Sequence, residues 1–452
     1  MAAQVKDMTK GSSLKLIITF ALPLMLGNAC QQFYTMVDTI VVGQGVGVEA
    51  LAALGAADWL NWMVLGIILG FTQGFSILIS HAFGANDEKE LKKVVAMSFV
   101  LGLVMAVILT VLSLCIAKPV LLLLNTPTNI IDQSLSYLTI IFAGISVVTA
   151  YNTFSAVLRA LGDSRTPLFA LMIAAVINII LDLLFVMVFH MGVAGAAIAT
   201  VIAQFCSSVF CFYSLRKISI VQLHKSDFKI EIPIITRLIQ LGALTAFQNV
   251  VISVGGMVVQ SVVNVYGFIY VAGFTATNKL YGLLELAATS LGFSVATFTG
   301  QNLGAKKYDR IKHGVKVSLI VGVLISIVIS AILIPFGTVF LKLFVSGTPD
   351  VTVQVLDVAY RYLFIMAIFL WVLYILHIYR SALQGMGDTF TPMLSGTAEF
   401  IMRVGAVLIL PYFMGTSGVY FAEIVAWIGA DVILVLSYFR KIKTLGNEKV
   451  VM

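Results

Sequence analysis

The stretch Leu158-Arg-Ala-Leu-Gly-Asp-Ser-Arg-Thr-Pro167 recurs near the other end of the chain as Leu383-Gln-Gly-Met-Gly-Asp-Thr-Phe-Thr-Pro392. The two copies lie 225 residues apart, which is about half the length of the 452-residue chain. A shorter pattern, Gly-Phe-Ser followed by Gly-Ala, occurs at 74–85 and again at 292–305 with nearly the same offset. A chain that repeats itself at half its length is expected to consist of two copies of one structural unit.

The composition indicates a membrane protein. Hydrophobic residues make up 60% of the chain and charged residues only 11%, with a mean hydropathy of +1.04. Soluble domains usually carry about 25% charged residues. Apolar runs long enough to cross a bilayer recur along the whole chain. Twelve spans are predicted, at 14–41, 50–80, 94–117, 130–157, 167–190, 195–215, 238–265, 269–300, 314–340, 357–383, 392–414 and 418–438.

The repeat and the spans together predict the fold class, an all-α membrane protein of twelve transmembrane helices in two six-helix bundles. The predicted parts are an N-terminal bundle at 1–215, a cytoplasmic linker at 216–237, a C-terminal bundle at 238–439 and a cytoplasmic tail at 440–452. Each half holds an even number of spans, so both copies enter the membrane in the same direction. We therefore expect a pseudo-two-fold axis along the membrane normal, as in transporters built from parallel repeats.

Basic residues predict the orientation of the chain. Most of the 28 Lys and Arg residues fall in the connections and tails on the side of the N-terminus, whereas Lys118 and Lys342 lie on the opposite side. By the positive-inside rule both termini are cytoplasmic, and we expect a multi-pass protein of the plasma membrane. This distribution accounts for the net charge of +7 without a nucleic-acid partner. The expected partners are membrane lipid and small molecules, and the expected state is a monomer.

Ionisable residues inside a span are costly and therefore mark candidate functional sites. Glu399 and Arg403 lie four residues apart on one predicted helix and are expected to pair with each other. Lys279 and Glu285 are six residues apart and cannot face each other directly. These two residues are candidates for lining a cavity in the second half.

Three further acids, Asp58, Glu423 and Asp431, lie near Trp59 or Trp427 in the sequence. Tryptophan is enriched where a span meets the membrane surface. We therefore expect these acids to lie near the interfaces rather than deep in the bilayer.

Oxygen-bearing side chains gather at one predicted depth in the first half. Asn178 and Asp182 are four residues apart and point from one helix face. The fifth and sixth spans reverse near Met191, the midpoint between 182 and 200, so Thr200 returns to the depth of Asp182. At about 1.5 Å per residue this depth is roughly 13 Å from the turn, inside the hydrocarbon.

The first predicted span carries a polar stripe. Asn28, Gln31, Thr35 and Asp38 are spaced by three or four residues and share one helix face, with Asp38 toward the outer end. Pro23 precedes them within the span and frees a backbone carbonyl. Two interpretations of this proline stay open: a fixed kink, and a helix that bends and straightens during transport.

These carboxylate, amide and hydroxyl oxygens form a candidate cation site. Hard oxygen donors suit an alkali cation, and two carboxylates that share a buried site need a proton or a cation to offset their charge. The alternative is that Asp38 and Asp182 only fix helix packing through hydrogen bonds. The repeat offsets pair Asp38 with Val258 and Asn178 with Arg403. The oxygen group is therefore expected in the first half only.

The chain resembles the multidrug and toxic compound extrusion (MATE) family. The matching elements are Pro23 before Asp38 on the first span, Gly-Asp-x-x-x-Pro after the fourth, Asn178-x-x-x-Asp182 on the fifth and the repeated Gly-Ala element. The resemblance covers essentially the whole chain. Members of this family are antiporters that export organic cations and other amphipathic compounds against inward Na⁺ or H⁺. The resemblance implies the same function here, multidrug efflux and xenobiotic export, with no cofactor beyond the coupling ion.

The resemblance also implies which residues bind the coupling ion. The implied site comprises Asp38, Asn178, Asp182, Thr200 and the backbone near Ala196, and the same side chains would bind Na⁺ if Na⁺ is the coupling ion. Tyr34 and Tyr137 are implied neighbours, and Gln31, Asn28, Glu285 and Lys279 are further candidates for supporting the site or lining the substrate path. One branch of the family couples through acids on the seventh and tenth spans, but no Asp or Glu occurs at 248–252 or 373–376. The chain is therefore more similar to the branch that couples through the N-terminal lobe, the DinF-like type.

The sequence lacks features that other functions require. A flippase for a lipid-linked precursor, from the same superfamily, is expected to carry several basic residues in its cavity, and only Lys279 and Arg403 are candidates here. An intramembrane enzyme needs a nucleophile–base pair or a metal cluster. The five His residues, with His377 inside a span, form no such group in the sequence. A passive channel is disfavoured because no repeated selectivity filter is found. We therefore expect a transporter and not an enzyme.

Overall fold

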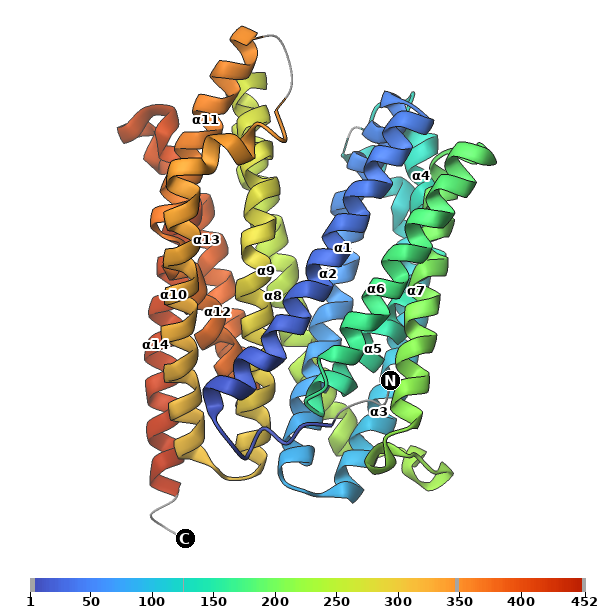
Figure 1. Cartoon of the computed structure of the whole chain (residues 1–452), viewed down its shortest axis with the longest axis vertical. Coiled ribbons are helices and arrows are strands. Elements are labelled where there is room, and N and C mark those ends of the chain that lie inside the picture. The colour runs from blue at the N-terminus through green and yellow to red at the C-terminus, as the bar shows by residue number, and fades with distance from the viewer. Residues whose placement is uncertain (1–4, 125, 346–348, 449–452) are drawn as a thin grey trace. The chain divides into compact units, whose positions relative to one another are not determined.

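Helices make up nearly all of the computed structural model, which describes residues 5–124, 126–345 and 349–448 (Figure 1). The α-helices are α1 (Ser13–Gly45), α2 (Val48–Gly84), α3 (Glu88–Leu123), α4 (Ile131–Ala143), α5 (Ile145–Ala160), α6 (Arg165–Asp182), α7 (Gly192–Arg216), α8 (Ile232–Val265), α9 (Phe268–Gly304), α10 (Tyr308–Leu341), α11 (Pro349–Ile368), α12 (Leu370–Gly385), α13 (Phe390–Met414) and α14 (Ala422–Glu448). Short segments are the π-helix η1 (Leu183–Val188) and the 3-10 helices η2 (Ser219–Val221), η3 (Lys225–Phe228) and η4 (Gly415–Phe421). The described residues contain no strand, so the predicted all-α class is confirmed.

The chain forms two compact units. Unit 1 contains Leu22–Ala246 and the described residues before Met8, and unit 2 contains Met8–Ala21 and the described residues from Phe247 onward. Helices α1 and α8 therefore each contribute to both units. The boundary in α8 lies beyond the predicted linker 216–237, and Met8–Ala21 groups with the second unit although the sequence placed it in the first bundle.

The number of membrane spans agrees approximately with the predicted twelve. Ten segments of the described chain are long and apolar enough to cross a membrane, and the bent pair α4–α5 makes eleven. This pair bends by 47° at Gly144. One of the ten segments, Phe390–Leu445, contains both α13 and α14, which pack against each other. Counted separately, these two helices bring the total to twelve in the part of the chain that the structure describes.

Several helices continue beyond their predicted apolar spans. Helix α3 begins at Glu88 rather than at 94, because Asp87 caps it by accepting from Glu90 N at 2.9 Å. Glu88 then pairs with Lys92 one turn later, at 2.6 Å. Hydropathy alone misses these turns because their residues are polar while their backbone is helical.

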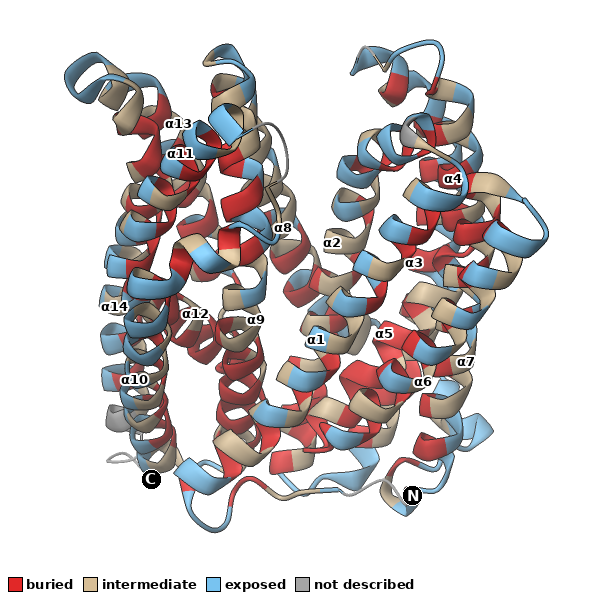
Figure 2. Cartoon of the chain, turned by 45° about the horizontal axis from the view of Figure 1, so that its top comes forward, coloured by how far each residue is buried: buried red, intermediate tan, exposed pale blue. Residues whose placement is uncertain are grey.

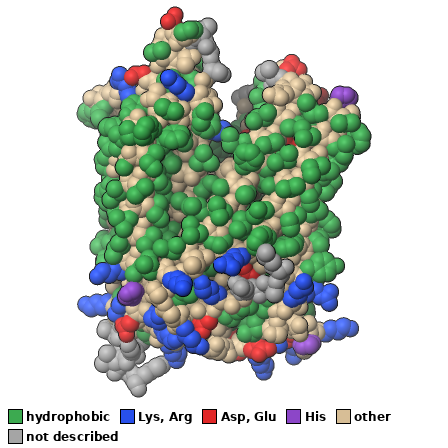
Figure 3. All heavy atoms as spheres, in the orientation of Figure 1, with side chains coloured by type: hydrophobic (Ala, Val, Ile, Leu, Met, Phe, Trp, Pro, Cys, Tyr) green, Lys and Arg blue, Asp and Glu red, His purple; other side chains and the backbone are tan. Residues whose placement is uncertain are grey.

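The outer sides of the helices are apolar and exposed. Leu103, Val107 and Val111 of α3 are 66%, 57% and 57% exposed and lie on one helix face at intervals of four residues. Figure 2 shows buried residues along the sides of helices that face neighbours in the same unit. In Figure 3 hydrophobic side chains cover the middle of the visible face, and Lys and Arg gather toward one end. This pattern is that of a surface exposed to lipid.

Small residues bring α2 and the first half of α8 together within unit 1. A Cβ added at Gly70 or Gly74 would collide with the backbone of Ala246 or Gly242. Such close approach of helix backbones is typical of membrane helices with small residues at the contact. It explains why the first part of α8 belongs to unit 1.

The repeated sequence stretches form the same turn in both units. Gly162 and Gly387 follow α5 and α12 with φ values of 84° and 76°, a region that favours glycine. In each copy the amide after the glycine donates to the carbonyl five residues earlier, Leu158 or Leu383, at 2.9 and 3.0 Å. This pattern is the Schellman motif that ends a helix.

An aspartate then starts the next helix in each copy. Asp163 Oδ1 accepts from Thr166 N at 3.0 Å, and its Oδ2 accepts from the Thr166 hydroxyl at 2.6 Å. Asp388 accepts the same two bonds from Thr391, at 3.0 and 2.8 Å. Each aspartate thus bonds a backbone N–H group at the start of α6 or α13 that has no partner within the helix. The two copies of the repeated sequence form the same hydrogen bonds.

Candidate ion-coupling and substrate sites

Three helices of unit 1 carry the predicted oxygen group. Asp38 lies on α1, Asn178 and Asp182 lie on α6, and Thr200 lies on α7. Helices α6 and α7 pack against each other. Asn178 Nδ2 donates to Thr200 Oγ1 at 3.4 Å, so the predicted return of Thr200 to this depth is confirmed for Asn178. The π-helix η1 begins directly after Asp182, and π-helical turns often occur at functional sites.

The oxygens of this group are buried and incompletely bonded. Asp38 is 6% exposed, and Asn178 and Asp182 are fully buried. Among the described residues no hydrogen-bond partner reaches Asp38 Oδ1, Asn178 Oδ1 or either carboxylate oxygen of Asp182. A buried carboxylate without a donor is unfavourable unless a proton or a cation binds it. Asp38 and Asp182 lie within electrostatic range of each other.

Aromatic and amide side chains surround the two acids. Tyr34 of α1 interacts with both acids and with Gln31 and Gln204. Tyr137 of α4, also buried, lies within electrostatic range of the same acids. Gln204 was not predicted, although it lies four residues after Thr200 on α7 and could have been found by continuing the same helix face.

The remaining predicted residues of unit 1 have different surroundings. Ala196 is buried on α7, one turn before Thr200. Asn28 is half-buried on α1, and Pro23 lies inside this continuous helix. Asp58 is exposed, as the interface prediction expects, and it interacts electrostatically with Asp38.

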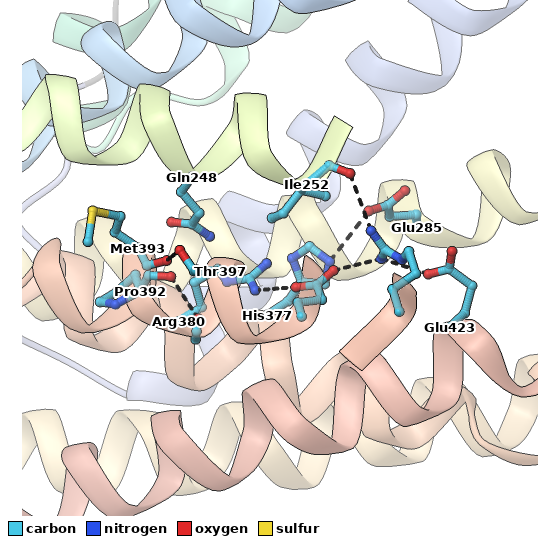
Figure 4. A network of polar contacts seen from close by, with 12 residues as sticks. Gln248, Ile252, Glu285, His377, Arg380, Pro392, Met393, Thr397 and Glu423 are labelled. Atoms are coloured by element: carbon cyan, nitrogen blue, oxygen red, sulfur yellow. Dashed lines mark hydrogen bonds and ion pairs between the residues drawn. The ribbon is translucent and has the colours of Figure 1, made fainter. Parts of the chain in front are cut away.

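Unit 2 holds a chain of alternating charges in place of the oxygen group (Figure 4). Glu399 accepts from Arg380 Nη2 at 2.7 Å and from Arg403 Nη2 at 2.8 Å. Arg403 Nη2 also donates to Glu423 at 2.7 Å, and Arg403 Nη1 donates to Ile252 O at 3.3 Å. The predicted pair of Glu399 and Arg403 is therefore confirmed, but it is part of a larger network that ties α8, α12, α13 and α14 together.

This network corrects the prediction for Glu423. Its side chain is 16% exposed and bonded to Arg403, and Trp427 is 1% exposed, so both are largely buried within unit 2. Trp427 instead stacks on Tyr281, with ring centroids 6.1 Å apart and planes 17° apart. A tryptophan can fill a core position as well as an interface, and sequence proximity does not separate the two.

Glu285 has a histidine as its partner. His377 Nε2 of α12 lies 3.6 Å from Glu285 Oε1 of α9, and Figure 4 shows the two side chains facing each other. Lys279, on the same helix as Glu285, is exposed. The structure thus joins one predicted cavity residue, Glu285, to the polar network and leaves Lys279 on the surface.

Comparison with known proteins identifies the family of the chain. The MatE family model matches residues 23–184 and 245–408, one match in each half of the chain. The chain belongs to the MATE family. Its MATE relatives include the probable multidrug resistance protein YoeA of Bacillus subtilis, 29% identical over 94% of this chain and 88% of the relative. They also include YpnP of the same organism, 34% identical over 68% of both chains, and the probable multidrug resistance protein NorM of Thermotoga maritima, 26% identical over 93% and 89%.

Solved structures share the fold of this MATE chain. A MOP superfamily transporter from Pyrococcus furiosus superposes with a TM-score of 0.93 and 21% identity, over 99% of both chains. A multidrug resistance MATE family transporter in an outward-facing conformation superposes with a TM-score of 0.91 and 21% identity, over 99% and 100% of the two chains. The protein is thus a multi-pass membrane transporter of a family whose relatives carry multidrug resistance and export names.

Arg380 belongs to the charge network of this MATE chain but was not among the predicted site residues. This residue lies three positions after His377, inside the predicted span 357–383, and is 8% exposed. Its position as a basic residue within a span, one helical turn from a histidine, could have marked it as a candidate. No group of three or more His, Cys, Asp or Glu side chains in the described residues is arranged to hold a metal ion.

Proposed function

We propose that this MATE transporter is a cation-coupled antiporter, which exports organic cations and other amphipathic compounds by alternating access while H⁺ or Na⁺ enters. The observation that supports coupling is the set of buried oxygens of Asp38, Asn178 and Asp182 that no donor in the described residues reaches. The multidrug names of its relatives support the class of exported compound. The membrane potential supplies about 2.3 kcal/mol per charge at about 100 mV.

In this proposal the coupling ion binds among Asp38, Asn178, Asp182 and Thr200, with Ala196 contributing its backbone. Binding offsets the charge of two buried acids, which otherwise repel each other. Helix α1 carries Asp38 in unit 1 and begins in unit 2, so a change at Asp38 can pass along one continuous helix. Bending at Pro23, just after the boundary between the units, is the movement that we propose for α1.

The proposal includes the location, orientation and oligomeric state of the protein. It lies in the plasma membrane with both termini in the cytoplasm, works as a monomer in contact with lipid, and couples through unit 1 as in the DinF-like branch. No cofactor beyond the coupling ion takes part. The alternative, a flippase for a lipid-linked precursor, has less support because Arg380 and Arg403 are both engaged by glutamates and offer little charge to a pyrophosphate.

Gradient-driven efflux from reconstituted vesicles tests the proposal. A Na⁺ gradient and a pH gradient are imposed separately, and export of ethidium is followed. Asp38→Asn and Asp182→Asn should each abolish gradient-driven export, because an amide keeps the size of the side chain but cannot offset a cation. Glu90→Gln, on the exposed first turn of α3, is the matched control and should export normally.

Protein yield and monodispersity should be unchanged in all three variants. Full gradient-driven export by Asp182→Asn would assign that residue to helix packing instead. Failure of the wild-type protein to respond to either gradient would refute coupling altogether.

A further inference from the structure

The glutamates and arginines of the charge network in unit 2 are unequal in number. Arg380 and Arg403 are the arginines of the network, and Glu399 and Glu423 are their bonded partners. Glu285 is a third glutamate whose described ion-pair partner is His377, which carries a charge only when protonated. The charge of Glu285 is therefore offset in one protonation state of His377 and left over in the other.

Other ionisable groups lie around this pair on every neighbouring helix. Those that act on the pair or on its partners are Tyr281 on α9, Arg380 on α12, Glu399 and Arg403 on α13, and Glu423 and Asp431 on α14. Asp357 and Arg361 of α11 pair with each other at 2.9 Å, and the charged residues of α10 lie in its first turns. Arg380 and Arg403 match Glu399 and Glu423 in number, so the pair of Glu285 and His377 is the part of the set whose charge depends on protonation.

Glu285 is the most exposed of the three glutamates in the network. Its side chain is 38% exposed, whereas those of Glu399 and Glu423 are 5% and 16% exposed. Gly282, one turn earlier on α9, has open space where a side chain would stand, with no atom within 4 Å. Tyr281, one turn before Glu285 and stacked on Trp427, places an aromatic ring beside the carboxylate.

We propose that Glu285 and His377 form a proton-operated binding point for the positive charge of an organic cation. With His377 neutral, the Glu285 carboxylate and the Tyr281 ring bind a quaternary or protonated ammonium group. With His377 protonated, the imidazolium pairs with Glu285 and takes the place of that cation. This inference deepens the proposed function and rests on its substrate class, but not on the ion site in unit 1.

Equilibrium binding without any gradient tests the pair directly. Ethidium is the probe, because its charge is permanent and does not change with pH. Its fluorescence polarisation is measured with purified protein in detergent at pH about 8 and about 5.5, since histidine side chains as a class change charge over this range. The wild-type protein should bind roughly tenfold more weakly at the lower pH, the effect expected for losing one charged contact.

Variants of the two residues should separate their roles. Glu285→Gln should bind roughly tenfold more weakly than the wild type at the higher pH and lose the dependence on pH. His377→Gln should keep the stronger binding at both pH values, because no imidazolium forms. Glu285→Asp keeps the charge and should keep a response to pH. The matched controls are Glu90→Gln and His313→Gln, both at exposed positions, which should behave as the wild type.

Each contrary result is informative. Wild-type affinity in Glu285→Gln, or an unchanged pH response in His377→Gln, would overturn the binding point, provided that both variants are monodisperse. Absence of ethidium binding by the wild type would overturn it as well. Loss of gradient-driven export with the pH-dependent binding intact would refute only the antiport proposal. Normal export by Glu285→Gln with unchanged binding would refute only the binding point at Glu285 and His377.

Discussion

Glu399 is a buried acid whose charge would be unfavourable without its arginine partners. Its two carboxylate oxygens are each bonded to a different arginine, and its side chain is 5% exposed. Burying an ion costs several kcal/mol, which only bonded counter-charges offset. Arg380 and Arg403 depend on it in turn, since both lie in the same buried network.

We expect Glu399→Gln to destabilise the protein by about 3 kcal/mol, because it leaves buried guanidinium groups without a full counter-charge. The measurement is thermal unfolding in detergent. Asp357→Asn is the matched control: it also breaks a carboxylate–arginine pair, but the pair with Arg361 is 58% and 62% exposed and contributes little. Equal melting temperatures of the two variants would contradict the account of the network.

At the scale of elements, the repeated turns are the parts that most closely reproduce each other. Asp163 begins α6 and Asp388 begins α13 through the same two hydrogen bonds to a threonine three residues later. Neither aspartate belongs to the oxygen group or the charge network. Because both lie between two spans, we expect them to affect folding rather than substrate choice.

Asp163→Ala and Asp388→Ala should each destabilise the protein by about 1–2 kcal/mol, the usual cost of losing an N-terminal cap. The two losses should be similar, because the bonds are the same in both units. Asp132→Ala, an exposed acid in the first turn of α4, is the control and should have a smaller effect. Thermal unfolding measures the stability, and an export assay with several compounds should show an unchanged order of preference. A selective change in that order would mean that these turns contact substrate.

At the scale of the whole molecule, the two copies of the repeat have diverged in chemistry while keeping their architecture. The repeat offset aligns Asn178 of unit 1 with Arg403 of unit 2. In unit 1 no donor among the described residues reaches Asn178 Oδ1 or the carboxylate oxygens of Asp182, whereas in unit 2 the Arg403 guanidinium donates to neighbouring acids. The two copies therefore offer different chemistry: an arginine among acids in unit 2, and buried amide and carboxylate oxygens in unit 1.

The orientation of the chain gives a prediction at the same scale. Single cysteines are placed at Ser226 in η3 and at Thr128 before α4, both exposed, after Cys30, Cys115, Cys206 and Cys211 are replaced. A membrane-impermeant maleimide should label Ser226→Cys only from the cytoplasmic side and Thr128→Cys only from the outside, because basic residues surround the first position. Labelling from the opposite sides would invert the proposed topology.

The sequence by itself determined the helical class, the approximate number of spans, the repeat of one unit and the proximity of Asn178 and Thr200. These features depend on neighbours along the chain: apolar runs of sufficient length, Gly-Asp at a helix end, and side chains three or four residues apart on one face. The pair of Glu399 and Arg403 was predictable for the same reason, since both residues lie on one helix.

Only the tertiary structure decided which residues meet across helices. Arg380 reaches Glu399 from α12, and Glu423 reaches Arg403 from α14. His377 faces Glu285 of α9 from α12. The assignment of Met8–Ala21 to unit 2 also depends on such contacts, among them the bond from Met8 N to Gln301 Oε1 at 2.8 Å. Contacts of this kind depend on the rotation and depth of each helix against its neighbours. Packing between helices sets this rotation and depth, and the spacing of residues along one helix does not determine them.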